Sequence, residues 1–232
     1  MKHAVPAPPK LGTHEGLAYA LFEPDEDPTA AMVICHGAGS AKESHFDFGR
    51  VCRAHGLAAI AYDARGHGRS EGDFGPGAID DVLAMCDLMR EHAPRVALRG
   101  SSMGGFCAIH AAARDHSLAA VVAICPAPED GLRRGLRSGD FEFRCDVPAT
   151  ERWLETADLR AATGALGPET ALLLLHARGD ERVPYAVSEE LHALAHEPKR
   201  LVLFPGGHHR SLQHDEEVQA LSVRWIERAA DG

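Results

Sequence analysis

The sequence lacks long hydrophobic runs and runs of basic residues. No apolar stretch approaches the roughly 20 residues that span a bilayer, and the amino-terminal MKHAVPAPPK has no apolar core of the kind found in signal peptides. The 34 Asp and Glu outnumber the 24 Lys and Arg, which gives a formal net charge of −10. A nucleic-acid binder would need a strong basic patch to overcome that field. We therefore expect a cytoplasmic protein with no membrane span and no nucleic-acid partner.

Paired cysteines and phosphate-binding motifs are missing as well. The six cysteines lie far apart, form no CxxC pair and mostly fall inside apolar runs, which predicts small buried side chains instead of disulfides or a zinc site. The glycine-rich stretch DARGHGRS at 63–70 does not fit the pattern GxxxxGK[ST] of a phosphate cradle. The sequence therefore predicts no cofactor.

Short apolar runs alternate with amphipathic stretches along most of the chain. Six runs are nearly continuous in hydrophobicity, as strands covered on both faces are, and an alternating run at 16–22 indicates a strand nearer an edge. Stretches such as 77–92 and 215–228 place apolar residues on one helical face, with acidic residues at the start and arginines at the end. This order predicts one α/β domain over 1–232, with a mostly parallel central sheet and helices on both faces. The six runs are 30–37, 57–63, 95–100, 118–125, 171–177 and 199–207.

One interval, about 127–168, breaks this alternation because it holds no strand-like run. We expect it to form a lid insertion of loop and short helix over one end of the sheet. Its arginines either select an acidic or phosphorylated substrate or pair with acidic residues of a solvated lid surface. Its aromatic residues either line an acyl pocket or anchor the lid to the body. The residues concerned are Arg133, Arg134, Arg137, Arg144, Phe141, Phe143 and Trp153.

The stretch RGSSMGG at 99–105 places glycines where a helix should begin, although glycine weakens a helix by roughly 1 kcal/mol relative to alanine. Gly100, Ser102 and Gly104 fit the pattern G-x-S-x-G, a strained strand-to-helix turn that exposes its central serine as a nucleophile. The turn follows the third run of the parallel series, at the edge of the sheet where functional residues gather. Ser101 occupies a flanking position, so Ser102 is the predicted nucleophile.

A serine hydroxyl needs an adjacent base that is itself oriented by an acid. In proteins with this G-x-S-x-G turn, called a nucleophile elbow, the triad residues follow in the order Ser, Asp or Glu, His along the chain. Asp180 follows the run at 171–177, and His208 and His209 follow the run at 199–207. These positions predict Asp180 as the acid of a catalytic triad and leave both histidines as candidates for the base.

Four stretches resemble the motifs of α/β-hydrolase-fold serine hydrolases, and the resemblance covers nearly the whole chain. It implies that the backbone amides of Ala38 and Met103 form the oxyanion hole, and Gly39 is the alternative for the first amide. The stretches are HGAGS (36–40), DARGHGRS (63–70), GSSMGG (100–105), and GDERVP (179–184) paired with PGGHHR (205–210).

The same resemblance bears on the choice of histidine. The family's P-G-x-x-H pattern, read from Pro205, points to His209 as the base. A shorter G-x-H pattern, read from Gly206, points to His208 instead. We therefore favour His209 and keep His208 as the alternative base.

A metal site is the other use that these histidines could have. His208, His209 and His214, together with Asp215, offer imidazole and carboxylate ligands. Their spacing matches no HExxH-type signature, and the triad already uses one of them. We expect no metal.

The combined pattern predicts a serine hydrolase that cleaves small carboxylic esters or thioesters through an acyl-enzyme intermediate. One alternative is a peptidase, because GDERVPYAVSEEL at 179–191 resembles a segment of prolyl-oligopeptidase-type enzymes, although those carry an additional gating domain that we do not expect here. A second alternative is a non-catalytic binding protein of the same fold, but such proteins usually lose a triad residue and this chain has a candidate for each. The expected partner is a small-molecule ester.

Overall fold

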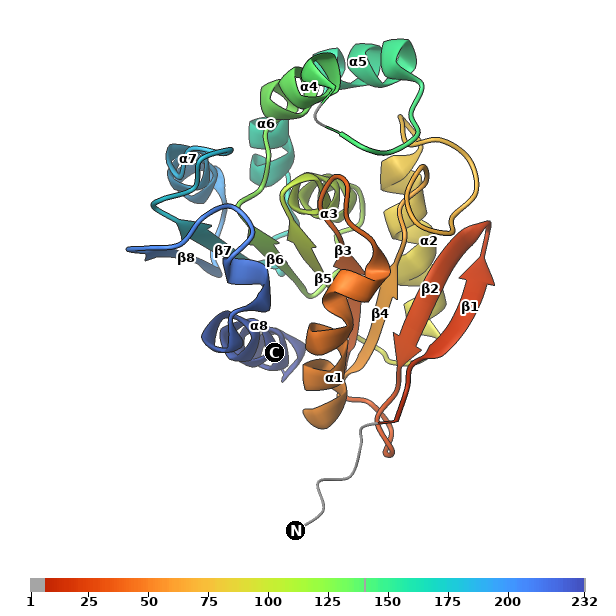
Figure 1. The fold of residues 1–232 in the computed structure, drawn as a ribbon. Helices are drawn as coiled ribbons and strands as arrows, with labels where there is room; N and C mark the ends of the chain where they lie inside the picture. Colours follow the sequence, from red (N-terminus) through yellow and green to blue (C-terminus); the bar gives the residue numbers. More distant parts are fainter. Residues whose placement is uncertain (1–6, 140, 232) are drawn as a thin grey trace.

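The computed structural model describes residues 7–139 and 141–231. At its centre lies an eight-stranded sheet in the order β1-β2-β4-β3-β5-β6-β7-β8 (Figure 1). The strands from β4 to β8 in this order are all parallel, whereas β1 and β2 run antiparallel to their neighbours. The strands are β1 (Lys10–His14), β2 (Leu17–Phe22), β3 (Ala31–Cys35), β4 (Ala58–Tyr62), β5 (Val96–Ser101), β6 (Ala120–Ile124), β7 (Ala171–Ala177) and β8 (Lys199–Phe204).

Helices cover both faces of the sheet (Figure 1). Successive strand residues point to opposite faces, so β3 sends Val33 and Cys35 into one core and Met32 and Ile34 into the other. Helices α2 to α7 contribute to the first core, and α1 and α8 contribute to the second. This arrangement confirms the predicted fold class. The helices are α1 (Phe46–Ala54), α2 (Ala78–Arg90), α3 (Met103–Arg114), α4 (Glu129–Ser138), α5 (Val147–Thr156), α6 (Leu159–Gly164), α7 (Ala186–Leu194) and α8 (Glu216–Asp231), with 3₁₀ turns at Lys42–His45 and Leu212–His214.

The edge strand β1 was not predicted from the sequence. Its sequence, KLGTH, holds one large apolar residue, Leu11, and that side chain is 65% exposed. The strand is instead held by antiparallel backbone pairing with β2. Hydrophobic periodicity cannot detect an edge strand that buries so little.

The interval 127–168 contains three helices. Helices α4 and α5 lie together above one end of the sheet (Figure 1). Helix α6 behaves differently, because it packs against α3 and α7 of the main body. The part that stands over the sheet is therefore the pair α4 and α5, which we call the lid helices.

No helix in the described part of the chain is long and apolar enough to cross a membrane. All six thiols are free, and every cysteine except Cys145 is buried.

Asp215, one of the residues considered as a metal ligand, accepts a hydrogen bond from the backbone N–H of Val218 at 3.0 Å. Its carboxylate thus caps the start of α8.

Candidate active site

Ser102 stands at the turn between β5 and α3 in a strained conformation. Its φ of 53° and ψ of −116° lie outside the regions that L-residues normally adopt. The neighbouring glycines explain why the turn can form. A Cβ at Gly100 would lie 2.1 Å from the carbonyl oxygen of Gly104, and a Cβ at Gly104 would lie 2.1 Å from the carbonyl oxygen of Cys35. The turn therefore requires glycine at both positions, which is the geometry of a nucleophile elbow.

Asp180 and His209 meet at the ends of the adjacent strands β7 and β8. The Nδ1 atom of His209 lies 2.8 Å from Oδ2 of Asp180. The other carboxylate oxygen, Oδ1, accepts hydrogen bonds from the backbone N–H groups of Arg182 and Val183 at 2.8 and 2.9 Å. The Asp180 side chain is fully buried and that of His209 is 8% exposed. This pairing orients the His209 ring, and among the described residues its Nε2 has no hydrogen-bond partner.

The Asp180 carboxylate is held in its ionised form. Burial alone would raise its pKa, but hydrogen bonds from the side chains of His176 and His209 and from the backbone outweigh burial, so the pKa lies well below its ordinary value. An ionised carboxylate is what an orienting acid needs, because it can accept the Nδ1–H of the histidine and stabilise the imidazolium.

His176, in β7, is a neighbour of Asp180 that the sequence analysis missed. Its Nε2 lies 3.0 Å from the carbonyl oxygen of Val183 and 3.4 Å from Oδ2 of Asp180, and its Nδ1 lies 2.7 Å from Oγ of Ser188. Because both acceptors face Nε2, that nitrogen carries the proton. The sequence does contain a signal for this residue: His176 is the one histidine in the apolar run ALLLLHA, and it stands four residues before Asp180.

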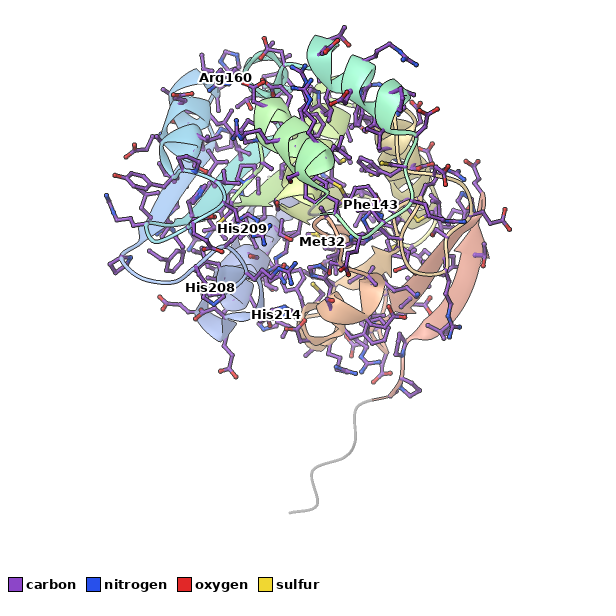
Figure 2. The ribbon with its side chains drawn as sticks, turned by 45° about the horizontal axis from the view of Figure 1, so that its top comes forward. Met32, Phe143, Arg160, His208, His209 and His214 are labelled. Carbon is purple, nitrogen blue, oxygen red and sulfur yellow. The ribbon has the colours of Figure 1, made fainter. Side chains whose placement is uncertain are left out.

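The other two candidate histidines lie apart from Asp180. His208 is exposed, and its backbone N–H donates to Oγ of Ser211 at 3.0 Å. The Nδ1 of His214 pairs instead with Asp47, 3.0 Å from its Oδ2. Figure 2 shows all three labelled histidines, which belong to the segment between β8 and α8.

The structure does not bring His208, His214 and Asp215 together with His209 as a metal-binding group. Among the described residues, the trio whose ligand atoms lie within 4.8 Å of one another is Cys125, Asp180 and His209. Two of its members already bond each other.

The HGAGS loop after β3 lies against the elbow. A Cβ at Gly37 would lie 3.5 Å from the Cβ of Ser102. In the described part of the chain, the backbone N–H groups of Ala38 and Met103 have no acceptor. The N–H of Gly39 is engaged, because it donates to Nε2 of His67 at 3.3 Å. This engagement favours Ala38 over Gly39 as a free donor.

Two buried histidines hold this loop in place. The Nε2 of His36 accepts from the N–H of Ala64 at 2.9 Å, so its Nδ1 carries the proton that is donated to the carbonyl of Gly37 at 2.8 Å. His67 accepts from Gly39 and donates its Nδ1–H to the carbonyl of Arg65 at 3.0 Å. Burial lowers the pKa of His67 to about 4, so the ring stays neutral and can accept. The two rings thereby join the HGAGS and DARGHGRS loops.

A cleft of about 940 Å³ joins these parts. Ser102, His209 and Ala38 all line it, and residues that follow β3, β5, β6, β7 and β8 form its floor and walls. The cleft therefore lies at the carboxyl ends of the strands, under helix α4, which also lines it. The hydroxyl of Ser102 bonds no other residue in the described segments, so it is free to meet a ligand in this cleft.

The lid insertion contributes both contact types that the sequence left open. Phe141 lines the cleft. Phe143 stacks on His67 with the ring centroids 4.1 Å apart, and so anchors the insertion to the body. Arg133 and Arg137 form ion pairs with Glu155 and Glu151 of α5.

Comparison with known proteins agrees with this architecture. Residues 26–138, just under half of the chain, match a family model described as serine aminopeptidase, S33. The Escherichia coli protein YfhR, described as uncharacterized, is 25% identical over 196 residues. That alignment covers 80% of this chain and 65% of YfhR, so the chain spans about two thirds of that relative.

A second relative and a solved structure extend the comparison. Human monoglyceride lipase is 36% identical over 114 residues, which cover 45% of this chain and 37% of the lipase. The structure of Est1E from Butyrivibrio proteoclasticus with ferulic acid bound superposes with a TM-score of 0.73 at 19% identity, over 96% of this chain and 98% of Est1E. The sheet order, the strained serine turn and these likenesses together show that the chain has the α/β-hydrolase fold.

Proposed function

We propose that the protein is a serine hydrolase that cleaves small carboxylic esters or thioesters through a Ser102–His209–Asp180 triad. The observation that carries this proposal is the 2.8 Å contact between His209 and Asp180 in the cleft that Ser102 also lines. A buried, ionised carboxylate on Nδ1 of a histidine is the arrangement that makes its Nε2 a base.

The reaction follows from the roles of these groups. Nε2 of His209 takes the proton of the Ser102 hydroxyl while Oγ attacks the carbonyl carbon of the ester. The backbone N–H groups of Ala38 and Met103 donate to the oxygen that becomes negative. His209 then gives its proton to the departing alcohol or thiol, which leaves the acyl group on Ser102.

A water molecule then hydrolyses the acyl-enzyme with the help of the same residues. His209 removes a proton from a water molecule, the hydroxide attacks the acyl-enzyme, and a second tetrahedral intermediate uses the same two amides. Its collapse returns the proton to Oγ of Ser102 and releases a carboxylic acid. The strained backbone at Ser102 supports this role, because strain at a turn of this kind holds the nucleophile exposed.

Ester cleavage is favoured over peptide cleavage by a relative of known activity. Human monoglyceride lipase is 36% identical to this chain over 114 residues, and its name is that of an ester hydrolase. Peptide hydrolysis is the second candidate, because the matching family model is described as a serine aminopeptidase. Parallel assays with an aminoacyl anilide and the corresponding aminoacyl ester separate the two.

The nucleophile can be tested directly. A fluorophosphonate should add once to the protein, and peptide mapping should find the adduct on Ser102. Ser102→Ala should abolish both labelling and ester hydrolysis, whereas Ser101→Ala is the neighbouring control and should still be labelled. An adduct on Ser101, or no adduct on folded protein, would refute the assignment.

A further inference from the structure

We propose that the cleft selects esters that carry a negative charge, such as a free carboxylate or phosphate, on the part of the substrate that lies away from the scissile bond. This inference rests on the proposed function, because it names the substrate class of that same site. Its basis is the charge distribution around the cleft.

Three arginines line the cleft from three different segments. Arg134 belongs to helix α4 of the lid, Arg182 to the loop between β7 and α7, and Arg210 to the loop between β8 and α8. Arg182 and Arg210 each lie within two residues of a proposed triad member. Three cationic residues from separate segments thus line the same cleft as Ser102 and His209, in a chain whose formal net charge is −10.

Few carboxylates line the cleft to offset the positive charge of these arginines. Its one carboxylate among the described lining residues is Glu181. One oxygen of that carboxylate accepts the backbone N–H of His209 at 3.1 Å, and backbone hydrogen bonds from its own amide and from that of His209 lower its pKa below the ordinary value. Its other oxygen lies 4.0 Å from Nε of Arg182. Glu181 is therefore already engaged, and it faces one of the three cations.

Helix α4 separates two kinds of arginine. Arg133 and Arg137, four residues apart and so on one helical face, form ion pairs with Glu155 and Glu151 of α5. Arg134 is rotated from Arg133 by about 100° and lines the cleft, with no carboxylate within 4.0 Å among the described residues. The acidic partners of the lid thus account for the arginines that face α5 and leave Arg134 for the cleft.

Gly131 of the same helix lines the cleft beside this side chain. At Gly135, one turn on, the ring of Phe141 fills the place of a side chain, since a Cβ there would lie 2.2 Å from its Cζ. A Cβ at Gly131 would lie 3.8 Å from Nη2 of the Arg134 guanidinium. Since a guanidinium presents a planar fork of donors that matches carboxylate and phosphate oxygens, an anionic substituent entering under α4 can bind there directly.

The test compares matched esters. The first is a para-nitrophenyl monoester of adipic acid with its distal carboxylate free, and the second has that carboxylate capped as a primary amide. A third ester carries a distal phosphate and tells carboxylate from phosphate selection. We expect kcat/KM to be about tenfold higher for the free carboxylate or the phosphate than for the amide, mainly through KM, because each exposed ion pair contributes modestly. The preference should shrink as salt is added.

Variants assign the preference to residues. Arg134→Gln and Arg210→Gln should each lower the ratio of anionic to neutral kcat/KM, and the double variant should bring it close to one. Arg137→Gln is the matched control, because it removes a lid arginine that pairs with Glu151 outside the cleft, and it should keep the wild-type ratio. Circular dichroism and thermal unfolding check that each variant folds.

The outcomes distinguish this inference from the proposed function. Equal kcat/KM for all three esters, with fluorophosphonate labelling intact, would overturn the charge selection and leave the hydrolase proposal standing. A preference that Arg137→Gln reduces as much as Arg134→Gln would overturn the assignment to the cleft. If no ester is hydrolysed, calorimetric binding of the same adipate monoester to the Ser102→Ala protein still measures the charge preference, and binding that the arginine variants do not weaken would refute it.

Discussion

His209 and Asp180 form a 2.8 Å hydrogen bond at the ends of two adjacent strands, and two backbone amides hold the second carboxylate oxygen in position. The consequence is that Asp180 can hardly rotate without losing three hydrogen bonds at once. The His209 ring therefore takes its orientation from the backbone of the loop that follows β7.

Removing the charge of the acid should disable the base. Asp180→Asn keeps the size of the side chain but can donate to Nδ1 of His209 and so select the wrong tautomer, which we expect to lower kcat by roughly ten-thousand-fold. His209→Ala should cost at least as much, since triad members act as a unit. His208→Ala is the control because His208 is exposed and forms no hydrogen bond with Asp180 among the described residues. Near-normal kcat in His209→Ala, with activity lost in His208→Ala, would reverse the assignment.

Deleting one amide donor should slow the chemical step. Ala38→Pro removes the N–H proposed for the oxyanion hole, and loss of one such donor costs roughly 100- to 1000-fold in kcat. Ala38→Ser keeps the N–H and should change kcat only slightly. Thermal unfolding of both variants checks the fold. A folded Ala38→Pro enzyme with near-normal kcat would place the first donor elsewhere in the HGAGS loop.

The close approach at the elbow predicts a strong effect on stability. A Cβ at Gly104 would lie 2.1 Å from the carbonyl oxygen of Cys35, so the backbones of α3 and β3 would have to separate. We expect Gly104→Ala to lower the free energy of unfolding by about 3 kcal/mol, the upper end of the usual cost of overpacking a core. Gly77→Ala is the control, because no atom lies within 4 Å of its would-be Cβ and its φ is −73°. Urea unfolding of both variants measures the difference.

Buried His45 should make the protein sensitive to acid. Neither ring nitrogen has a hydrogen-bond partner among the described residues, and burial, assisted by the charge of Arg99, lowers the pKa of His45 to about 3. Between that value and the ordinary value of about 6.5, the unfolded chain binds a proton that the folded chain does not. The free energy of unfolding should therefore fall by about 1.4 kcal/mol per pH unit on acidification from this group alone.

The substitution His45→Leu tests this linkage. It removes the group that protonates on unfolding, so the slope of unfolding free energy against pH, measured by urea titration between pH values of about 4 and 6, should decrease by nearly that amount. His196→Leu, at an exposed position, is the control. An unchanged slope in His45→Leu would show that other groups dominate acid unfolding.

The elbow could be predicted from the sequence because its causes are local. Gly100, Ser102 and Gly104 stand within five residues, and the steric need for glycine acts between them and the adjacent strand. The central strands could also be predicted, because strands buried on both faces are continuous apolar runs. The strand β1 buries too little to leave such a signal.

The supporting contacts could not be predicted because they depend on distant segments. His67 becomes a hydrogen-bond acceptor only where the chain brings it to Gly39, 28 residues away. His176 belongs to the end of β7 and reaches Asp180 in the loop that follows, but the partner of its Nδ1 is Ser188 of α7. Likewise, the sequence could not tell Arg133 from Arg134, since the face of α4 that meets α5 is set by packing.

The strand that precedes the proposed nucleophile is held more firmly in the sheet than the strand that precedes the proposed base. Ser102 follows β5, which is buried along its whole length in the middle of the sheet, whereas His209 follows β8, an edge strand with no fully buried residue that pairs with β7 alone. Edge strands open locally at a lower free energy than central ones. Fraying of this one strand would carry the histidine away from a serine that stays in place, so catalytic competence would be lost in a molecule that keeps most of its helices, and amide hydrogen exchange in β8 would report it first.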